Sequence, residues 1–116
     1  MNEINELKMK ENTNYTENNC SLKQVLDIIG GKWAMPIIYI LSKGKMRFKE
    51  LERSIEGINT RMLVKELKNM EANGIITREV FATVPPTVEY TLTSKGEKLL
   101  PSITSLHQWG QEFANQ

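Results

Sequence analysis

The chain has 116 residues, of which 40% are hydrophobic and 25% charged, and its formal net charge is +1. A chain of this size buries roughly two-thirds of its unfolded surface, which is enough for one core and leaves no room for a second activity of any size. No apolar run reaches the ~18 residues of a membrane span, and the first residues lack the apolar stretch of a signal peptide. We therefore expect a cytoplasmic protein that does not associate with membranes.

Charge and composition divide the chain unevenly. Residues 1–19 are rich in Asn, Glu, Lys and Thr, have little to bury and are expected to form a flexible N-terminal arm. They hold two Lys and four Glu, so the predicted domain, residues 20–116, carries +3. Residues 43–53 alone contain five basic and two acidic residues. Because local charge rather than the total decides binding, the small net charge does not exclude a nucleic-acid partner.

Two apolar helices are predicted at the start of the domain. Ser21 is suited to cap the first, and the Gly30-Gly31 pair ends it. Its apolar face consists of four aliphatic side chains, Leu22, Val25, Leu26 and Ile29. The second helix runs up to Gly44 and tolerates Pro36 because that residue falls in the first turn, where amides have no partner within the helix. We expect four of its residues on one side, Trp33, Ile37, Ile40 and Leu41.

The middle of the chain has the spacing of a helix-turn-helix motif. A short helix is predicted from the apolar stripe of Phe48, Leu51 and Ile55, and residues 56–58 form a tight connection into the next helix. That next helix begins at the N-cap residue Asn59 and ends before Gly74. Its core-facing residues recur at helical spacing, namely Leu63, Leu67 and Met70. Two helices joined in this way are typical of DNA-binding proteins.

The outer face of the second of these helices is cationic. At ~100° per residue, Arg61, Lys65 and Lys68 fall within a sector of about 60°. Thr60 and Val64 flank them, and Thr60 lies in the first turn, where a recognition helix usually meets base edges. Basic residues on a solvated helix face are also common in proteins that do not bind DNA. The assignment therefore depends on the neighbouring elements.

Those neighbours have the pattern of a wing. Residues 75–81 form one predicted strand, and alternating apolar and polar residues at 87–92 form a second. Residues 82–86 contain two prolines, which cannot donate to a strand ladder and so belong in the connection at the wing tip. A short edge strand at 45–47 is expected to pair with the wing. Besides the recognition helix, we expect three residues to contact DNA, Lys49, Arg78 and Thr83.

The C-terminal helix, from Ser94 onward, has a longer apolar stripe than a small domain needs. Pro101 predicts a kink or break near Leu100. We interpret the surplus as a dimer interface formed with the first helix across a two-fold axis. Its predicted residues are Leu22, Leu26, Leu99, Ile103, Leu106, Trp109 and Phe113. The alternative is that Trp109 and Phe113 fold back on Trp33.

Several short motifs resemble one family. They are Gly30-Gly31-Lys32-Trp33, Arg47-Phe48 with Leu51, Gly74 and Arg78, Val84-Pro85-Pro86, Val88-Glu89-Tyr90, Leu92-Thr93, Gly96, Leu99-Leu100-Pro101 and Trp109-Gly110. In this order they resemble the HxlR-type branch of bacterial winged-helix transcriptional regulators, over residues 20–109. The resemblance implies a mainly α fold with a small antiparallel sheet (α+β), a winged helix-turn-helix. It also implies a homodimer, joined through the first and last helices, that binds an inverted-repeat operator in double-stranded DNA and represses or activates neighbouring genes.

Cys20 is the single cysteine, so no disulfide within the chain is possible. It precedes the first predicted helix, whose N-terminal dipole favours a thiolate. In several proteins similar to this one, a cysteine at the corresponding place senses oxidants or other electrophiles, and the resemblance implies that role for Cys20. The alternative is a small packing residue at a helix start.

Other chemistry is not indicated. His107 has no second His or Cys at ligand spacing, so we predict no metal site. No nucleophile with a base, phosphate-binding loop or paired carboxylates is present, and we predict neither an enzyme nor a cofactor. A small-molecule effector is left open. Two functions remain: a DNA-binding regulator, and a winged-helix protein-interaction module that does not bind DNA.

Overall fold

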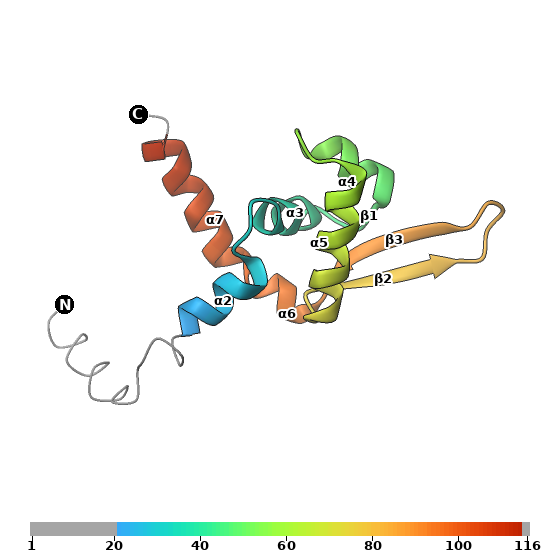
Figure 1. Ribbon diagram of the computed structural model, residues 1–116, viewed down its shortest axis with the longest axis horizontal. Helices are drawn as coiled ribbons and strands as arrows, with labels where there is room; N and C mark the ends of the chain where they lie inside the picture. Colours follow the sequence, from blue (N-terminus) through green and yellow to red (C-terminus); the bar gives the residue numbers. More distant parts are fainter. Residues whose placement is uncertain (1–20, 115–116) are drawn as a thin grey trace, which may run out of the picture. The chain divides into compact units, whose positions relative to one another are not determined.

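The computed structural model describes residues 21–114 and is mainly helical, with one small sheet (Figure 1). This confirms the predicted fold class. The chain divides into two compact units, one ending at Gly30 and the other beginning at Gly31. The elements in chain order are α2 (Ser21–Ile29), α3 (Ala34–Leu41), β1 (Met46–Arg47), α4 (Phe48–Ser54), α5 (Thr60–Ala72), β2 (Ile76–Phe81), β3 (Thr87–Leu92), α6 (Ser94–Glu97), α7 (Leu100–Trp109) and the π-helical turn η2 (Gly110–Ala114).

Helix α2 ends as predicted but begins differently. Ser21 is its first helical residue rather than its cap. At the other end, the Gly30 amide donates to the Leu26 carbonyl oxygen at 2.8 Å. A Cβ at Gly30 would lie 2.2 Å from that oxygen, so only glycine fits this close approach. The helix therefore stops where the sequence changes from aliphatic residues to glycine.

The apolar helix α3 supplies the centre of the core in the part that begins at Gly31. Ile37 and Ile38 are fully buried and Leu41 is 3% exposed, whereas Ile40 is half-buried. The predicted face was therefore only partly right. Every residue of α3 (AMPIIYIL) is apolar except for the hydroxyl group of its tyrosine. Periodicity therefore cannot select a buried face in this helix. Pro36 lies in the first turn and is exposed, as expected.

The helix-turn-helix consists of α4 and α5. Helix α4 begins where the Arg47 amide donates to Glu50 Oε1 at 2.9 Å. The connection passes through Gly57, whose φ of +88° strains any residue with a side chain. Helix α5 is then capped by Asn59, whose Oδ1 accepts a hydrogen bond from the Met62 amide at 2.8 Å. The predicted N-cap is confirmed.

The end of α5 is equally well defined. Gly74 has a φ of +73°. Its amide donates to the Glu71 carbonyl, and the Ile75 amide donates to the Met70 carbonyl, at 3.1 and 2.9 Å. These are the two hydrogen bonds of a Schellman motif, and they satisfy the last carbonyl groups of the helix. Both ends of α5 are therefore held by local chemistry that the sequence predicts.

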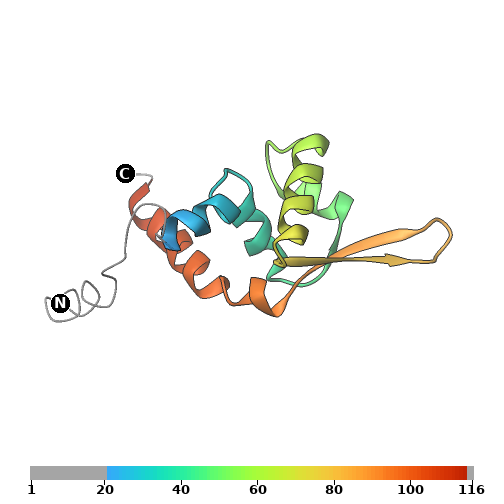
Figure 2. The ribbon, with the colours of Figure 1, turned by 60° about the horizontal axis from the view of Figure 1, so that its bottom comes forward.

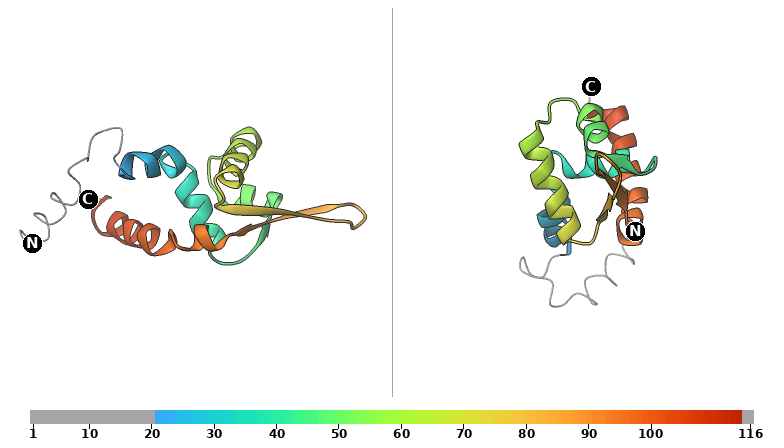
Figure 3. Two further views of the ribbon diagram at one scale, coloured as in Figure 1. Left: turned by 90° about the horizontal axis from the view of Figure 1, so that it is seen from below. Right: turned by 90° about the vertical axis from the view of Figure 1, so that its right-hand side faces the viewer.

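Three antiparallel strands form the sheet in the order β1-β3-β2. The predicted edge strand is confirmed, with Met46 opposite Tyr90 in the register. Tyr90, Leu92 and Ile76 point into the core and are at most 8% exposed. Figures 1 to 3 show the β2–β3 hairpin extending beyond α4 and α5, on the opposite side of α3 from α7.

The C-terminal helix is broken, as Pro101 predicts. Helix α6 ends at Glu97, and α7 begins at Leu100 with the proline in its first turn, where its missing amide costs no hydrogen bond. Ile103 is 5% exposed and belongs to the protein's own core. Little of its surface is left for a partner, because this side chain already packs inside the protomer.

Candidate nucleic-acid interface

The three predicted cations of α5, Arg61, Lys65 and Lys68, are all exposed on the face opposite the buried Leu63 and Met70. Within the part of the chain that the structure describes, none of the three lies within ion-pair distance of a carboxylate. A row of unpaired cations on one side of a helix suits the phosphates and base edges of a DNA groove.

Two apolar side chains border this cationic face. Val64 is 37% exposed on the side towards the sheet, and Met62 is 41% exposed on the other side. Sequence reasoning included Val64 but missed Met62. The signal was available, because at ~100° per residue both positions lie about equally far from the centre of the buried face. An exposed methyl group beside cations is suited to the methyl group of thymine.

Thr60 has a partner that sequence reasoning did not anticipate. Its hydroxyl donates to Glu52 Oε2, so the first turn of α5 is tied to α4. The hydroxyl proton is thus used within the helix-turn-helix, and only the oxygen lone pairs remain for a DNA base. The contact also holds a carboxylate near the N-terminus of α5, where the helix dipole favours negative charge.

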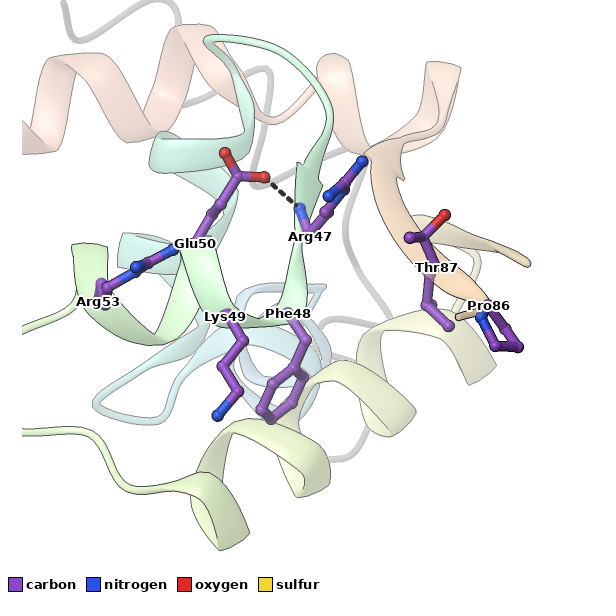
Figure 4. A pocket seen from close by; sticks show the side chains of 8 residues that line it. Arg47, Phe48, Lys49, Glu50, Arg53, Pro86 and Thr87 are labelled. Atoms are coloured by element: carbon purple, nitrogen blue, oxygen red, sulfur yellow. Dashed lines mark hydrogen bonds between the residues drawn. The ribbon is translucent and has the colours of Figure 1, made fainter. Parts of the chain in front are cut away.

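A groove of about 690 Å³ lies between α4 and the tip end of β3, where Pro86, Thr87 and Val88 line it (Figure 4). Three cations line it, Arg47, Lys49 and Arg53. Sequence reasoning predicts a DNA contact for Lys49 and misses the two arginines. The excess of basic residues in 43–53 was the signal. Figure 4 shows that the side chains of Arg47, on β1, and Lys49, on α4, point in different directions, so this is a broadly positive surface rather than a site with convergent ligands.

The hairpin has different chemistry. Residues 76–92 contain one cation, Arg78, and two carboxylates, and the tip at 82–86 has no charged residue. Thr83 Oγ1 donates to the Pro85 carbonyl at 2.7 Å, so it shapes the tip. Val84 is fully exposed. Glu89 approaches Lys45 at 3.8 Å, and its Oε1 is buried without a hydrogen bond.

Arg78 lies at a second, smaller hollow of about 340 Å³ between α5 and the sheet. Lys68 and Glu71 of α5 also line it, together with Phe48 of α4 and Tyr90 of β3. Two predicted DNA-contacting residues, Lys68 and Arg78, are thus brought to one place although ten positions separate them in the sequence.

The apolar residues predicted for a dimer interface are mostly exposed. In the C-terminal part, Leu106 is 56%, Trp109 58% and Phe113 46% exposed. The two rings pack on each other with centroids 5.5 Å apart. Trp33 instead lies near Gly57, so the predicted alternative, in which the two aromatic residues fold back on it, is not observed.

Two further predicted interface residues lie on α2 and are exposed, Leu22 at 69% and Leu26 at 61%. Leu99 is half-buried. Exposed aliphatic and aromatic side chains in this number are typical of surfaces that another protein covers.

Three further candidates are Cys20, the N-terminal arm and His107. Cys20 and the predicted arm lie outside the described residues. His107 stacks on Tyr39, with ring centroids 4.9 Å apart, and residues 21–114 contain no group of three potential metal ligands. No single helix among them is long and apolar enough to cross a membrane, and only α2 and α3 taken together across their break reach that length and composition.

The comparisons with known proteins agree with this geometry. Residues 28–116 match the model of a family described as HxlR-like helix-turn-helix. An HTH-type transcriptional regulator of Methanothermobacter thermautotrophicus is 42% identical over 96 residues, which are 83% of this chain and 73% of the relative. The HTH-type regulator YybR of Bacillus subtilis is 41% identical over 102 residues, 88% of this chain and 82% of YybR. The redox regulator HypR in its oxidized form is 43% identical with a TM-score of 0.77, covering 80% of this chain and 96% of HypR.

Proposed function

The chain belongs to the HxlR-like helix-turn-helix family, and we propose that this transcriptional regulator binds an inverted-repeat operator as a homodimer. The observation that carries the proposal is the exposed cationic face of α5, whose three cations form no ion pair with a carboxylate of residues 21–114. Arg61 and Lys65 contact base edges and phosphates in the major groove, and Thr60 and Val64 complete the contact in the first two turns. Lys49 and Arg78 contact phosphate, and the hairpin around Thr83 follows the adjacent backbone.

A two-fold dimer determines the form of the operator. The two copies of α5 enter successive major grooves on one side of the duplex, so half-sites lie about 34 to 36 Å apart centre to centre. The exposed apolar residues Leu106, Trp109 and Phe113, with Leu22 and Leu26 of α2, are the proposed contacts between protomers. We expect Trp109→Ser combined with Phe113→Ser to convert the dimer to a monomer in sedimentation analysis. Because both side chains are exposed in the protomer, its helical content should not change.

The test of operator binding is selection of fragments from a genomic DNA library by the purified protein at two salt concentrations. We expect enrichment of an inverted repeat, with an affinity that falls steeply as salt rises. The matched control is the triple variant Arg61→Ala, Lys65→Ala and Lys68→Ala, which changes exposed residues only. If the wild type enriched nothing at low salt, the protein-interaction module would be the better hypothesis.

We also propose that oxidation of Cys20 controls operator affinity. Support comes from the similarity to HypR, which is named a redox regulator, and from the single cysteine. In the proposed step, the Cys20 thiols of two protomers lose two protons and two electrons to an oxidant such as diamide and form one disulfide. We expect diamide to change the affinity of the wild type and to produce a covalent dimer on a non-reducing gel. An unchanged response in Cys20→Ser would remove this residue from the control.

A further inference from the structure

The hollow between α5 and the sheet combines two kinds of lining. Its apolar lining includes Phe48, Val64 and Tyr90, of which Tyr90 is 8% exposed. The exposed cations Lys68 and Arg78 line it as well. Neither cation lies within ion-pair distance of a carboxylate belonging to residues 21–114. Apolar side chains beside two exposed cations match a deoxyribose ring with its phosphate.

The position of the hollow points to the same ligand. It lies between α5 and the β2–β3 hairpin, which extends past α5 in Figures 1 and 3. In the proposed complex, α5 occupies a major groove and the hairpin reaches the adjacent backbone or minor groove. One sugar–phosphate strand separates a major groove from its neighbouring minor groove. That strand must therefore cross between the two elements, over the hollow.

We propose that this hollow is a binding site for one nucleotide of the operator backbone, a role that rests on the proposed function. Lys68 and Arg78 hold its phosphate from opposite sides, and Phe48 and Val64 contact the deoxyribose. Because every DNA strand offers this unit, the site adds affinity without sequence preference and sets the depth at which α5 sits in the groove.

The same hollow contains a residue that opposes the ligand. Glu71 lines it one helical turn after Lys68, and its carboxylate is exposed. A carboxylate beside the phosphate raises the electrostatic energy of the complex, so Glu71 lowers the affinity of the hollow for the phosphate. Sequence reasoning did not single out this residue. We infer that Glu71 keeps backbone binding weak, so that base contacts made by Arg61 dominate the choice of site.

The test combines neutral phosphates in DNA with charge variants of the protein. Each operator in a series carries one methylphosphonate linkage per half-site, which replaces one charged phosphate with a neutral group. The position of this linkage differs from one operator to the next. We expect one position at which the neutral linkage weakens wild-type binding severalfold but leaves the double variant Lys68→Ala, Arg78→Ala unaffected. Lys65→Ala is the matched control, because it removes an α5 cation that does not line the hollow, and it should remain sensitive at that position.

Glu71→Gln supplies the second arm of the test. We expect it to raise affinity for the unmodified operator severalfold, and to lose that gain when the linkage at the sensitive position is neutral. All four residues are exposed, and circular dichroism should confirm unchanged folding. If the double variant remained sensitive at every position, or Glu71→Gln had no effect, the inference would be wrong. If the wild type bound no operator at all, the proposed function itself would fail.

Discussion

Helix α5 and the β2–β3 hairpin, the two elements that we propose to contact DNA, differ in chemistry. Helix α5 has three exposed cations on one face, none of them ion-paired with a carboxylate of residues 21–114, whereas the hairpin at 76–92 carries a single cation and two carboxylates. The tip of the hairpin, residues 82–86, has no charged side chain, and its Val84 is fully exposed. The salt dependence of binding should therefore come from α5, α4 and Arg78 of β2, and the tip should contribute shape.

The largest expected effect is on α5. Arg61→Ala should weaken operator binding by about 1 to 3 kcal/mol and relax the base preference at one position of each half-site, because Arg61 is the cation nearest the helix start. Fluorescence titration against the operator and single-base variants measures both effects. The matched control is Thr83→Ala in the hairpin, which should leave the base preference unchanged. Unaltered affinity in Arg61→Ala would show that another side of α5 faces the groove.

The two regions should also differ in how much a local side-chain hydrogen bond contributes to the free energy of unfolding. Asn59→Ala removes the side-chain acceptor of the Met62 amide and should lower the free energy of unfolding by about 1 kcal/mol. Thr83→Ala removes a hydrogen bond confined to the exposed tip and should cost less than about 0.5 kcal/mol. Urea denaturation compares the two variants. Equal losses would mean that the tip contributes to stability as much as the helix cap.

A smaller effect is expected when the hairpin tip is given a positive charge like those of α5. Val84→Lys places a cation at the fully exposed tip of the hairpin. If the tip lies near the DNA backbone, the slope of log affinity against log salt should steepen by about 0.9 for each protomer. Val84→Gln has a polar side chain of similar exposure without the charge and should keep the wild-type slope. A slope that Val84→Lys leaves unchanged would place the tip away from phosphate.

Much of the interface was predictable because local chemistry determines it. Asn59 and Gly74 bound α5, and the spacing of Leu63 and Met70 orients it, so the exposure of Arg61 followed from residues within one helix. The same reasoning found the break before Pro101. It was less informative where a helix is apolar all round, as in α3, and where one apolar stripe contains both buried and exposed positions.

The C-terminal stripe is the clearest example of that second case. Ile103, Leu106 and Phe113 share one apolar pattern, yet Ile103 is buried in the protomer and the other two are exposed. Similarly, the pattern of α5 did not predict that the Thr60 hydroxyl donates to Glu52, eight positions earlier. Such outcomes depend on which surfaces meet, which is not encoded in the spacing along a single element.

By itself, the sequence determined the class of fold, the bounds and cationic face of the recognition helix, and membership of the family, since caps, glycines and periodicity act within a few residues. The tertiary structure alone decided that Lys68, Arg78 and Glu71 surround one hollow. Lys68 and Glu71 come from α5 and Arg78 from β2, and only the packing of α5 against the sheet brings the charge of Arg78 to the other two. Electrostatic energy depends on that distance in space rather than on separation along the chain.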